Sequence, residues 1–252
     1  MKQQGLNKCW MEGKGAINGW CSIPSTITAE IMSLNKFDSI TIDLQHGLID
    51  YQVALNILQV FSKIEATPMV RVPWNEPGII MKMLDAGSLG IICPMINNKE
   101  DASKFVGATK YVPDGFRSSG PTRAGMVHGS TYHDEANNKV ISLAMVETEE
   151  ALDNVDNIAS TEGLTGIYIG PSDLSISMGL MPGLDRTEEK MIKAIDKIKM
   201  ACKKHNIKVG IHCLSPEFLK NKLKEGYDLT TLGSDFRFFS EIVSKKIQET
   251  RE

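Results

Sequence analysis

The strongest constraint on the fold is a regular alternation between short apolar runs and longer amphipathic segments along the 252-residue chain. Short apolar runs predict buried strands, and apolar residues at helical spacing predict helices packed on one face. The predicted strands cover residues 17–23, 39–44, 67–72, 90–94, 140–146, 164–169, 208–211 and 229–232. The predicted helices cover residues 26–34, 51–63, 78–85, 99–108, 149–160, 186–205, 216–225 and 234–247.

Strands that alternate with helices favour a parallel sheet, and eight of them are the number that closes into a barrel. We therefore expect a single (β/α)8 TIM-barrel domain across residues 1–252. The alternative is an open doubly wound sheet, which normally carries a glycine-rich phosphate turn after its first strand. Here the first strand ends in Ser22-Ile23-Pro24-Ser25, so the sequence favours the barrel.

Residues 110–138 interrupt this rhythm. The stretch contains several prolines and glycines, among them Pro113, Gly120 and Gly129, and it shows no apolar periodicity. Segments of this length without a pattern are usually functional or mobile, so we expect an irregular loop here.

Charge and composition argue against several classes of protein. The net charge is −3 and no basic tract is present, so nothing favours a nucleic-acid partner. No apolar run is long enough to cross a bilayer, and the first 19 residues lack the pattern of a signal peptide. The five cysteines form no C-x-x-C pair, which is typical of free thiols in a reducing compartment. We expect a cytoplasmic protein with no membrane partner.

In such a barrel the chemistry lies at the carboxyl ends of the strands. Two carboxylates follow neighbouring predicted strands there, Glu147 and Asp173. Two carboxylates with open coordination positions suit a hard divalent cation that keeps some of its waters, such as Mg²⁺ or Mn²⁺. No predicted strand end carries the lysine that an imine-forming aldolase needs, so a metal is the expected electrophile.

Arg71 and two histidines complete the set of strand-end residues. An arginine beside a cation suits an anionic oxyacid or an enolate. His46 follows the second strand, and histidine is the natural group to move a proton near neutral pH. His212 ends the seventh strand and is equally consistent with a wall of the substrate pocket and with a proton carrier.

Each of these residues also has a purely structural alternative. Glu147 could cap the helix that begins near Thr148, and Asp173 could cap the helix that follows it. His46 could occupy an ordinary turn, and Arg71 could form a salt bridge across the barrel mouth. Their joint arrangement at the strand ends favours the functional interpretation.

The strand-end motifs resemble, in order, those of the HpcH/HpaI aldolase family. Asp43-Leu44-Gln45-His46-Gly47 is similar to the D-x-E/Q-H-G block of that family. Gly170-Pro171-Ser172-Asp173-Leu174-Ser175 is similar to its most telling motif, G-P-x-D-L-S. Further similar blocks are Val70-Arg71-Val72-Pro73, residues 84–94, Met145-Val146-Glu147-Thr148, Gly210-Ile211-His212 and Gly233-Ser234-Asp235. The likeness covers residues 19–239, nearly the whole chain.

The resemblance implies a class II, metal-dependent pyruvate aldolase of the 4-hydroxy-2-oxoheptanedioate aldolase type. Such a lyase reversibly cleaves a 4-hydroxy-2-oxo acid to pyruvate and an aldehyde through a metal-stabilised pyruvate enolate. The implied fold is a phosphoenolpyruvate/pyruvate-type barrel whose last helix is exchanged between subunits. The implied assembly is a dimer-based homo-oligomer, often a hexamer.

The resemblance also implies roles for individual residues. Glu147 and Asp173 would bind the cation, which would be Mg²⁺, Mn²⁺ or Co²⁺. Backbone amides near Gly170 and Ser172 would hold the pyruvate carboxylate, where a helix begins. Arg71 would stabilise the enolate oxygen. The remaining implied roles are proton transfer by His46 paired with Asp85, and an aldehyde pocket lined by Trp20 and His212.

Two parts of the sequence depart from the family pattern. Met145 stands where some members carry a glutamine, so the surroundings of the metal are expected to differ. The loop Tyr111-Val112-Pro113-Asp114-Gly115-Phe116-Arg117-Ser118 lacks one proline and one glycine of the Y-P-P-x-G-x-R-G loop of many members.

Three other functions remain open. A citrate-lyase β-like enzyme would cleave CoA esters, but no cluster of basic residues for the CoA phosphates follows the strands. An oxaloacetate decarboxylase-type relative would form the same enolate by breaking a different bond. A barrel that binds an oxyacid without turning it over would not need the full set of metal ligands, arginine and histidine.

Overall fold

The computed structural model describes residues 5–252 and closes eight strands into a barrel in the order β1 to β8. The strands are β1 (Ala16–Cys21), β2 (Ser39–Asp43), β3 (Thr67–Arg71), β4 (Gly90–Cys93), β5 (Ile141–Val146), β6 (Gly166–Ile169), β7 (Lys208–Cys213) and β8 (Leu229–Leu232). Every neighbouring pair is parallel, including β1 with β8. The predicted (β/α)8 TIM barrel is therefore confirmed.

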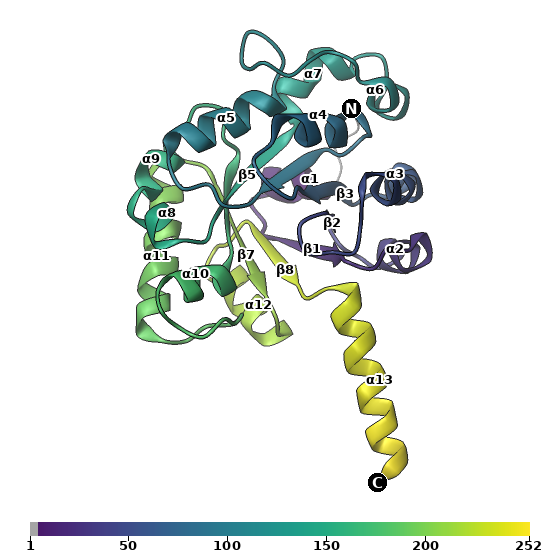
Figure 1. Cartoon of the computed structure of the whole chain (residues 1–252), viewed down its shortest axis with the longest axis vertical. Helices are drawn as coiled ribbons and strands as arrows, with labels where there is room; N and C mark the ends of the chain where they lie inside the picture. Colours follow the sequence, from purple (N-terminus) through teal and green to yellow (C-terminus); the bar gives the residue numbers. More distant parts are fainter. Residues whose placement is uncertain (1–4) are drawn as a thin grey trace.

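Helices surround the barrel on its outer side (Figure 1). They are α2 (Thr26–Ser33), α3 (Tyr51–Val60), α4 (Pro77–Asp85), α5 (Lys99–Thr109), α8 (Glu149–Asp153), α9 (Val155–Ala159), α10 (Pro171–Ser177), α11 (Glu189–Lys204) and α12 (Pro216–Lys224). Many begin directly after a side chain that accepts a backbone N–H of the first turn, which satisfies an otherwise unpaired donor. These caps are Ser25, Asp50, Glu76, Asn98, Thr148 and Ser215.

A short helix that the sequence did not predict, α1 (Gly5–Met11), closes the amino end of the barrel. The Leu6 side chain is fully buried, and its backbone N–H donates to Oγ1 of Thr67 at 3.1 Å. Nε1 of Trp10 donates to the carbonyl of Asp228 at 2.8 Å. Because α1 is so short, its position depends on these tertiary contacts rather than on an intrinsic helical pattern.

Residues 110–138 are irregular only in their first part, so the prediction of an irregular loop was wrong for the second. Residues 110–121 form no helix or strand, whereas α6 (Thr122–His128) and most of α7 (Tyr132–Lys139) follow. Both helices are short and mostly polar, so no apolar periodicity marks them in the sequence. Tertiary contacts stabilise them instead: Arg123 donates to the carbonyls of Ala86 and Leu58.

The barrel interior is largely apolar but also contains buried polar side chains, and its charged groups lie at the carboxyl end. One apolar cluster consists of Leu6, Ala16, Trp20, Met69, Ile92, Ile141, Leu143, Met145, Tyr168 and Leu229. Buried charged groups appear where the strands end: Asp43, Arg71 and Glu147. The polar end is where barrels of this type place their chemistry.

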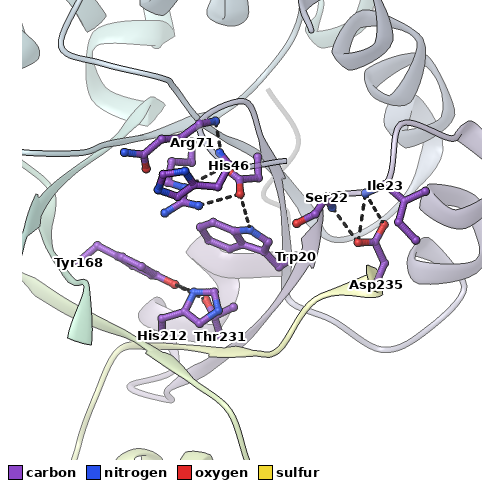
Figure 2. A network of polar contacts seen from close by, with 11 residues as sticks. Trp20, Ser22, Ile23, His46, Arg71, Tyr168, His212, Thr231 and Asp235 are labelled. Carbon is purple, nitrogen blue, oxygen red and sulfur yellow. Dashed lines mark hydrogen bonds and ion pairs between the residues drawn. The ribbon is translucent and has the colours of Figure 1, made fainter. Parts of the chain in front are cut away.

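The last helix, α13 (Asp235–Arg251), extends away from the barrel (Figure 1). Its first turn is attached to β1, because the Asp235 carboxylate accepts the backbone N–H groups of Ser22 and Ile23 (Figure 2). Beyond this turn its side chains are largely exposed. Within residues 5–252, no helix combines the length and the apolar character that crossing a bilayer requires.

The substitution Leu6→Ala is expected to lower the free energy of unfolding by about 2–5 kcal/mol, because it leaves a cavity at the base of the barrel. Met11→Ala in the same helix is the matched control, since Met11 is 70% exposed and its loss should change stability by less than about 0.5 kcal/mol. Urea unfolding curves of both variants measure the difference. Equal stabilities would show that α1 does not help to hold the barrel closed.

Candidate active site

Asp43 organises the carboxyl end of the barrel. It ends β2, and the register of the sheet pairs it with Arg71 at the end of β3. Nε of Arg71 donates to Oδ1 of Asp43 at 2.8 Å, and Nη2 donates to Oδ2 at 2.7 Å. Nε1 of Trp20 donates to the same Oδ2 at 3.2 Å (Figure 2). A two-point contact of this kind fixes the plane of the guanidinium as well as its position.

The charge state of Asp43 follows from these contacts. Burial alone would raise the pKa of the Asp43 carboxyl, but the hydrogen bonds and the positive charge of Arg71 outweigh it and lower the pKa overall. Both partners of the pair are buried. Asp43 and Arg71 therefore remain an ion pair at neutral pH.

The same carboxylate fixes the turn that carries His46. Oδ1 of Asp43 accepts the backbone N–H groups of Gln45 at 3.1 Å and of His46 at 3.3 Å. The turn requires Gly47, because a Cβ there would lie 2.2 Å from the carbonyl oxygen of Asp43. The His46 side chain is exposed. Asp43 thus places a fixed cation and an accessible imidazole at one end of the barrel (Figure 2).

Glu147 is a buried carboxylate with an incomplete set of partners. It follows β5 and is 1% exposed. Oε1 accepts the backbone N–H of Met95 at 2.8 Å, whereas no donor among the described residues reaches Oε2. Oε2 lies against Gly170, where a Cβ would come within 2.6 Å of it. The helix cap next to it is the side chain of Thr148, so Glu147 does not have the capping role that was its structural alternative.

The surroundings of Glu147 disfavour its ionised form, which a bound cation would stabilise. The pKa of Glu147 is raised to about 7, chiefly by burial and also by the nearby charge of Asp173, against the lowering effects of the Met95 N–H and Arg71. Asp173 lies in the first turn of α10 and is exposed. The cap position of α10 is Gly170, so Asp173 is not the cap that was its structural alternative.

These donors fit a hard divalent cation. They are carboxylate oxygens, one of them buried and without a partner, and Gly170 leaves open the space beside it. Across residues 5–252, no three His, Cys, Asp or Glu side chains converge on one point. A cation held by Glu147 and Asp173 would therefore keep open positions for waters or for substrate oxygens.

Gly170 and Ser172 lie at the start of α10, beside these carboxylates. No side chain caps this helix, so the N–H groups of its first turn have no side-chain partner. Met145, the departure from the family pattern, is buried in the barrel interior and packs against Gly170. Its thioether lies where some members carry an amide, so this side of the site is apolar here.

His212 faces the barrel interior from β7. Its Nδ1 lies 3.0 Å from the hydroxyl of Tyr168, and its ring meets the ring of Trp20 edge-on at 4.8 Å between centroids. Burial, followed by the positive charge of Arg71, lowers the pKa of His212 to about 3. His212 is therefore neutral at physiological pH, which favours a pocket wall over a proton carrier. The sequence did not single out Tyr168, because a tyrosine inside a strand is an ordinary strand residue.

Asp85 lies at the opposite end of the barrel from His46, so the pairing that the resemblance implies is not formed within this single chain. Asp85 is the last residue of α4, which runs back from the carboxyl end of β3 to the amino end of β4. Its Oδ1 accepts a hydrogen bond from Nη2 of Arg117 at 2.7 Å. Arg117 is buried beside the rings of Tyr111 and Tyr132. In the sequence, Arg117 was only one residue of a variant loop, and nothing there indicated a role for it.

Comparisons with known proteins agree with this geometry. The sequence profile of the HpcH/HpaI aldolase/citrate lyase family matches residues 19–241. The chain is 39% identical to a hydroxypyruvate/pyruvate aldolase of Rhizorhabdus wittichii, with 98% of each chain covered. It is 31% identical to a 5-keto-4-deoxy-D-glucarate aldolase of Klebsiella pneumoniae, with 91% of this chain and 90% of the relative covered.

A solved structure adds the fold. A HpcH/HpaI aldolase/citrate lyase family protein from Burkholderia cenocepacia superposes with a TM-score of 0.88 at 27% identity, over 95% of this chain and 96% of the other. The resemblance seen in the sequence motifs is thereby confirmed over nearly the full length. The chain belongs to the HpcH/HpaI aldolase/citrate lyase family.

Proposed function

We propose that this protein is a class II aldolase that reversibly cleaves a 4-hydroxy-2-oxo acid to pyruvate and an aldehyde. Its family and the relatives named as aldolases support a carbon–carbon lyase. The observation that carries the proposal is the pairing of a fixed Arg71 with a buried, half-satisfied Glu147 at the same end of the barrel. We assign Glu147 and Asp173 as ligands of a divalent cation, Mg²⁺, Mn²⁺ or Co²⁺.

The chemistry requires a place for negative charge. Cleavage of the bond between C3 and C4 leaves an electron pair on the carbon next to the ketone of pyruvate, and that charge moves onto oxygen as an enolate. A divalent cation supplies Lewis-acid stabilisation of this oxygen when it is bound. Asp43 occupies Nε and Nη2 of Arg71, so Nη1 stays available to the enolate oxygen. His46 is accessible and takes the proton of the C4 hydroxyl as the bond breaks.

Solvent exchange of the methyl protons of pyruvate tests this function without an aldehyde. The wild-type protein with Mg²⁺ or Mn²⁺ in D₂O should exchange them, and Arg71→Ala should slow the exchange by about 10²–10³-fold. Arg71→Lys is the matched control: it keeps the charge but loses the two-point contact with Asp43, and it should fall between the two. Proton NMR measures the rates.

Two results would contradict the proposal. Exchange that persists in excess chelator would remove the metal from the chemistry. Inactivation by borohydride in the presence of pyruvate would indicate an imine instead. Oxaloacetate and a CoA ester, assayed in parallel with hydroxy-oxo acids, separate the decarboxylase and citrate-lyase alternatives.

Metal affinity should depend on pH through Glu147. The pKa of Glu147 in the metal-free protein is raised to about 7, so the group is a carboxylate above that pH and a neutral acid below it. Protons compete with the cation, so the association constant should fall by up to about tenfold per pH unit below pH 7. Calorimetric titration with Mn²⁺ measures this. Glu147→Gln should bind weakly at every pH and lose the step near pH 7; an unchanged pH profile would exclude Glu147 as a ligand.

We further propose that the protein is a homo-oligomer in which α13 packs on another subunit. Along its length, α13 exposes large apolar side chains, which are Phe236, Phe239, Ile242, Val243 and Ile247. The neighbouring α2 exposes Ile27, Ile31 and Leu34. Contiguous apolar surface of this extent is typical of an interface, and a second copy of α13 and α2 is the occupant that the family resemblance implies.

The same arrangement offers a role for Asp85. Within one chain His46 and Asp85 lie at opposite ends of the barrel, yet the family resemblance pairs them. His46 is exposed, and Arg117 occupies only Oδ1 of Asp85, whose side chain is 29% exposed. We therefore propose that His46 of one subunit pairs with Asp85 of another.

Subunit mixing tests this pairing. His46→Ala and Asp85→Ala should each be inactive alone, but co-refolded 1:1 mixtures should recover about a quarter of wild-type activity, because random assembly restores that share of sites. Adding Phe239→Glu to both chains should lower the molecular mass of the assembly measured by sedimentation and abolish the recovery of activity. Mixtures that stay inactive while remaining oligomeric would show that the two residues do not share a site.

A further inference from the structure

A continuous line of hydrogen-bonded side chains crosses the barrel interior and ends at His212. Oδ1 of Asn18 accepts the hydroxyls of Ser39 at 2.8 Å and Thr41 at 3.1 Å. Nδ2 of Asn18 donates to Oγ1 of Thr231 at 2.9 Å. The Thr231 hydroxyl lies 2.7 Å from the hydroxyl of Tyr168, which lies 3.0 Å from Nδ1 of His212 (Figure 2).

The middle of this line is shielded from solvent. Asn18, Thr231 and Tyr168 are fully buried and belong to three strands of the closed barrel. Burial raises the pKa of Tyr168, so its hydroxyl keeps its proton. Leaving a buried polar group without a partner is unfavourable, so the hydrogen bonds of the line favour one arrangement of its side chains.

Two hydroxyls donate to Oδ1 of Asn18, so its amide nitrogen faces Thr231 and donates to it. Either oxygen can donate in the contact between Thr231 and Tyr168, and Nδ1 of His212 can accept from the Tyr168 hydroxyl or donate to it. The assignment that continues the direction set by Asn18 has Thr231 donate to Tyr168, and Tyr168 donate to Nδ1. With this assignment the proton of the neutral ring is on Nε2.

Nε2 has no partner among residues 5–252, and the ring is half-buried. Trp20 separates it from the enolate side of the site: the Arg71 guanidinium lies 4.8 Å from the Trp20 ring centroid on one side, and the His212 ring meets its edge (Figure 2). A substrate whose enolate oxygen meets Arg71 would therefore extend past Trp20 toward His212 with its other half. Because the pKa of His212 is lowered to about 3, the ring stays neutral across the working pH range.

We infer that His212 presents a fixed Nε2–H donor to an oxygen atom on the aldehyde half of the substrate, and that Tyr168 is the positioning residue that fixes this tautomer. The inference rests on the proposed aldolase function. It names the substrate class as aldehydes that carry a hydroxyl or carbonyl oxygen beside the reacting carbon. A site built around a donor discriminates strongly against an analogue that lacks the acceptor.

Two aldehydes of equal size test the inference. Glycolaldehyde and propionaldehyde differ by one hydroxyl in place of a methyl group, and each is condensed with pyruvate by the wild-type holoenzyme. The ratio of kcat/KM values should favour glycolaldehyde in the wild type and fall about tenfold in His212→Phe, which keeps a ring but has no donor. His212→Gln supplies an N–H near the Nε2 position and should restore much of the ratio. Tyr168→Phe should lower it by an intermediate amount.

Solvent exchange at the pyruvate methyl group separates this inference from the proposed function. It reports enolate formation without an aldehyde, so the wild-type holoenzyme alone tests the proposed function. Exchange in the wild type together with an unaltered aldehyde ratio in His212→Phe overturns the inference and leaves the aldolase intact. Absence of exchange in the wild type overturns the aldolase function and the substrate assignment with it.

The tautomer has its own readout. ¹⁵N chemical shifts of the histidine rings distinguish a protonated Nε2 from a protonated Nδ1, and the His212 signals are assigned by their loss in His212→Gln. A protonated Nε2 that becomes a mixture of tautomers in Tyr168→Phe supports the inference. A protonated Nδ1 in the wild type reverses the direction of the line and overturns it.

Discussion

The ion pair between Asp43 and Arg71 is the interaction on which the rest of the site depends. Both groups are buried, and such a pair is stable only when its geometry is good and its remaining hydrogen-bonding positions are filled. Asp43 meets this condition by also accepting the Trp20 indole and two backbone N–H groups. One carboxylate therefore fixes a cation, an aromatic wall and the turn that carries His46, and a change at Asp43 would disturb all three together.

Glu147 shows the opposite arrangement. Its burial is compensated by a single backbone donor, and a second carboxylate lies close enough to raise its pKa. A buried carboxyl group with so few partners costs stability, and a cation bound in place of the proton, as proposed, would offset that cost. The site would thus hold its permanent positive charge, Arg71, with a full set of hydrogen bonds and leave Glu147 short of partners for an exchangeable cation.

The barrel could be predicted because every strand is a local apolar run, and the closure of parallel strands brings their carboxyl ends together. That rule was enough to place Arg71, Glu147, Asp173 and His46 at the same end of the barrel, as the structure has them. It failed where position is set by tertiary contacts. The short helix α1 and the helices α6 and α7 carry no apolar period, because contacts such as those of Arg123 hold them.

Strand ends say less about other residues of the site. Asp85 precedes β4 rather than following β3, so it lies at the other end of the barrel, and its pairing with His46 is implied only by the family resemblance. The line from Asn18 through Thr231 and Tyr168 was invisible because threonine and tyrosine are common in strands, and only register in a closed barrel aligns them. Strand-end chemistry can be found from sequence; chemistry inside the barrel depends on how eight strands are staggered.

The charges at the barrel mouth determine what can bind there. Asp43 neutralises Arg71, so the positive charge of the guanidinium is not available to neutralise Glu147 and Asp173. If Glu147 and Asp173 hold one divalent cation, as proposed, their charges balance it and leave little net charge to attract an anionic substrate. Arg71 contributes a directed N–H rather than a free charge, so recognition of the proposed 2-oxo acid would come from short-range contacts: that N–H, the uncapped start of α10 and the open positions of the bound cation. A site of this kind selects by geometry, which is why the orientation of a neutral histidine on its far wall matters.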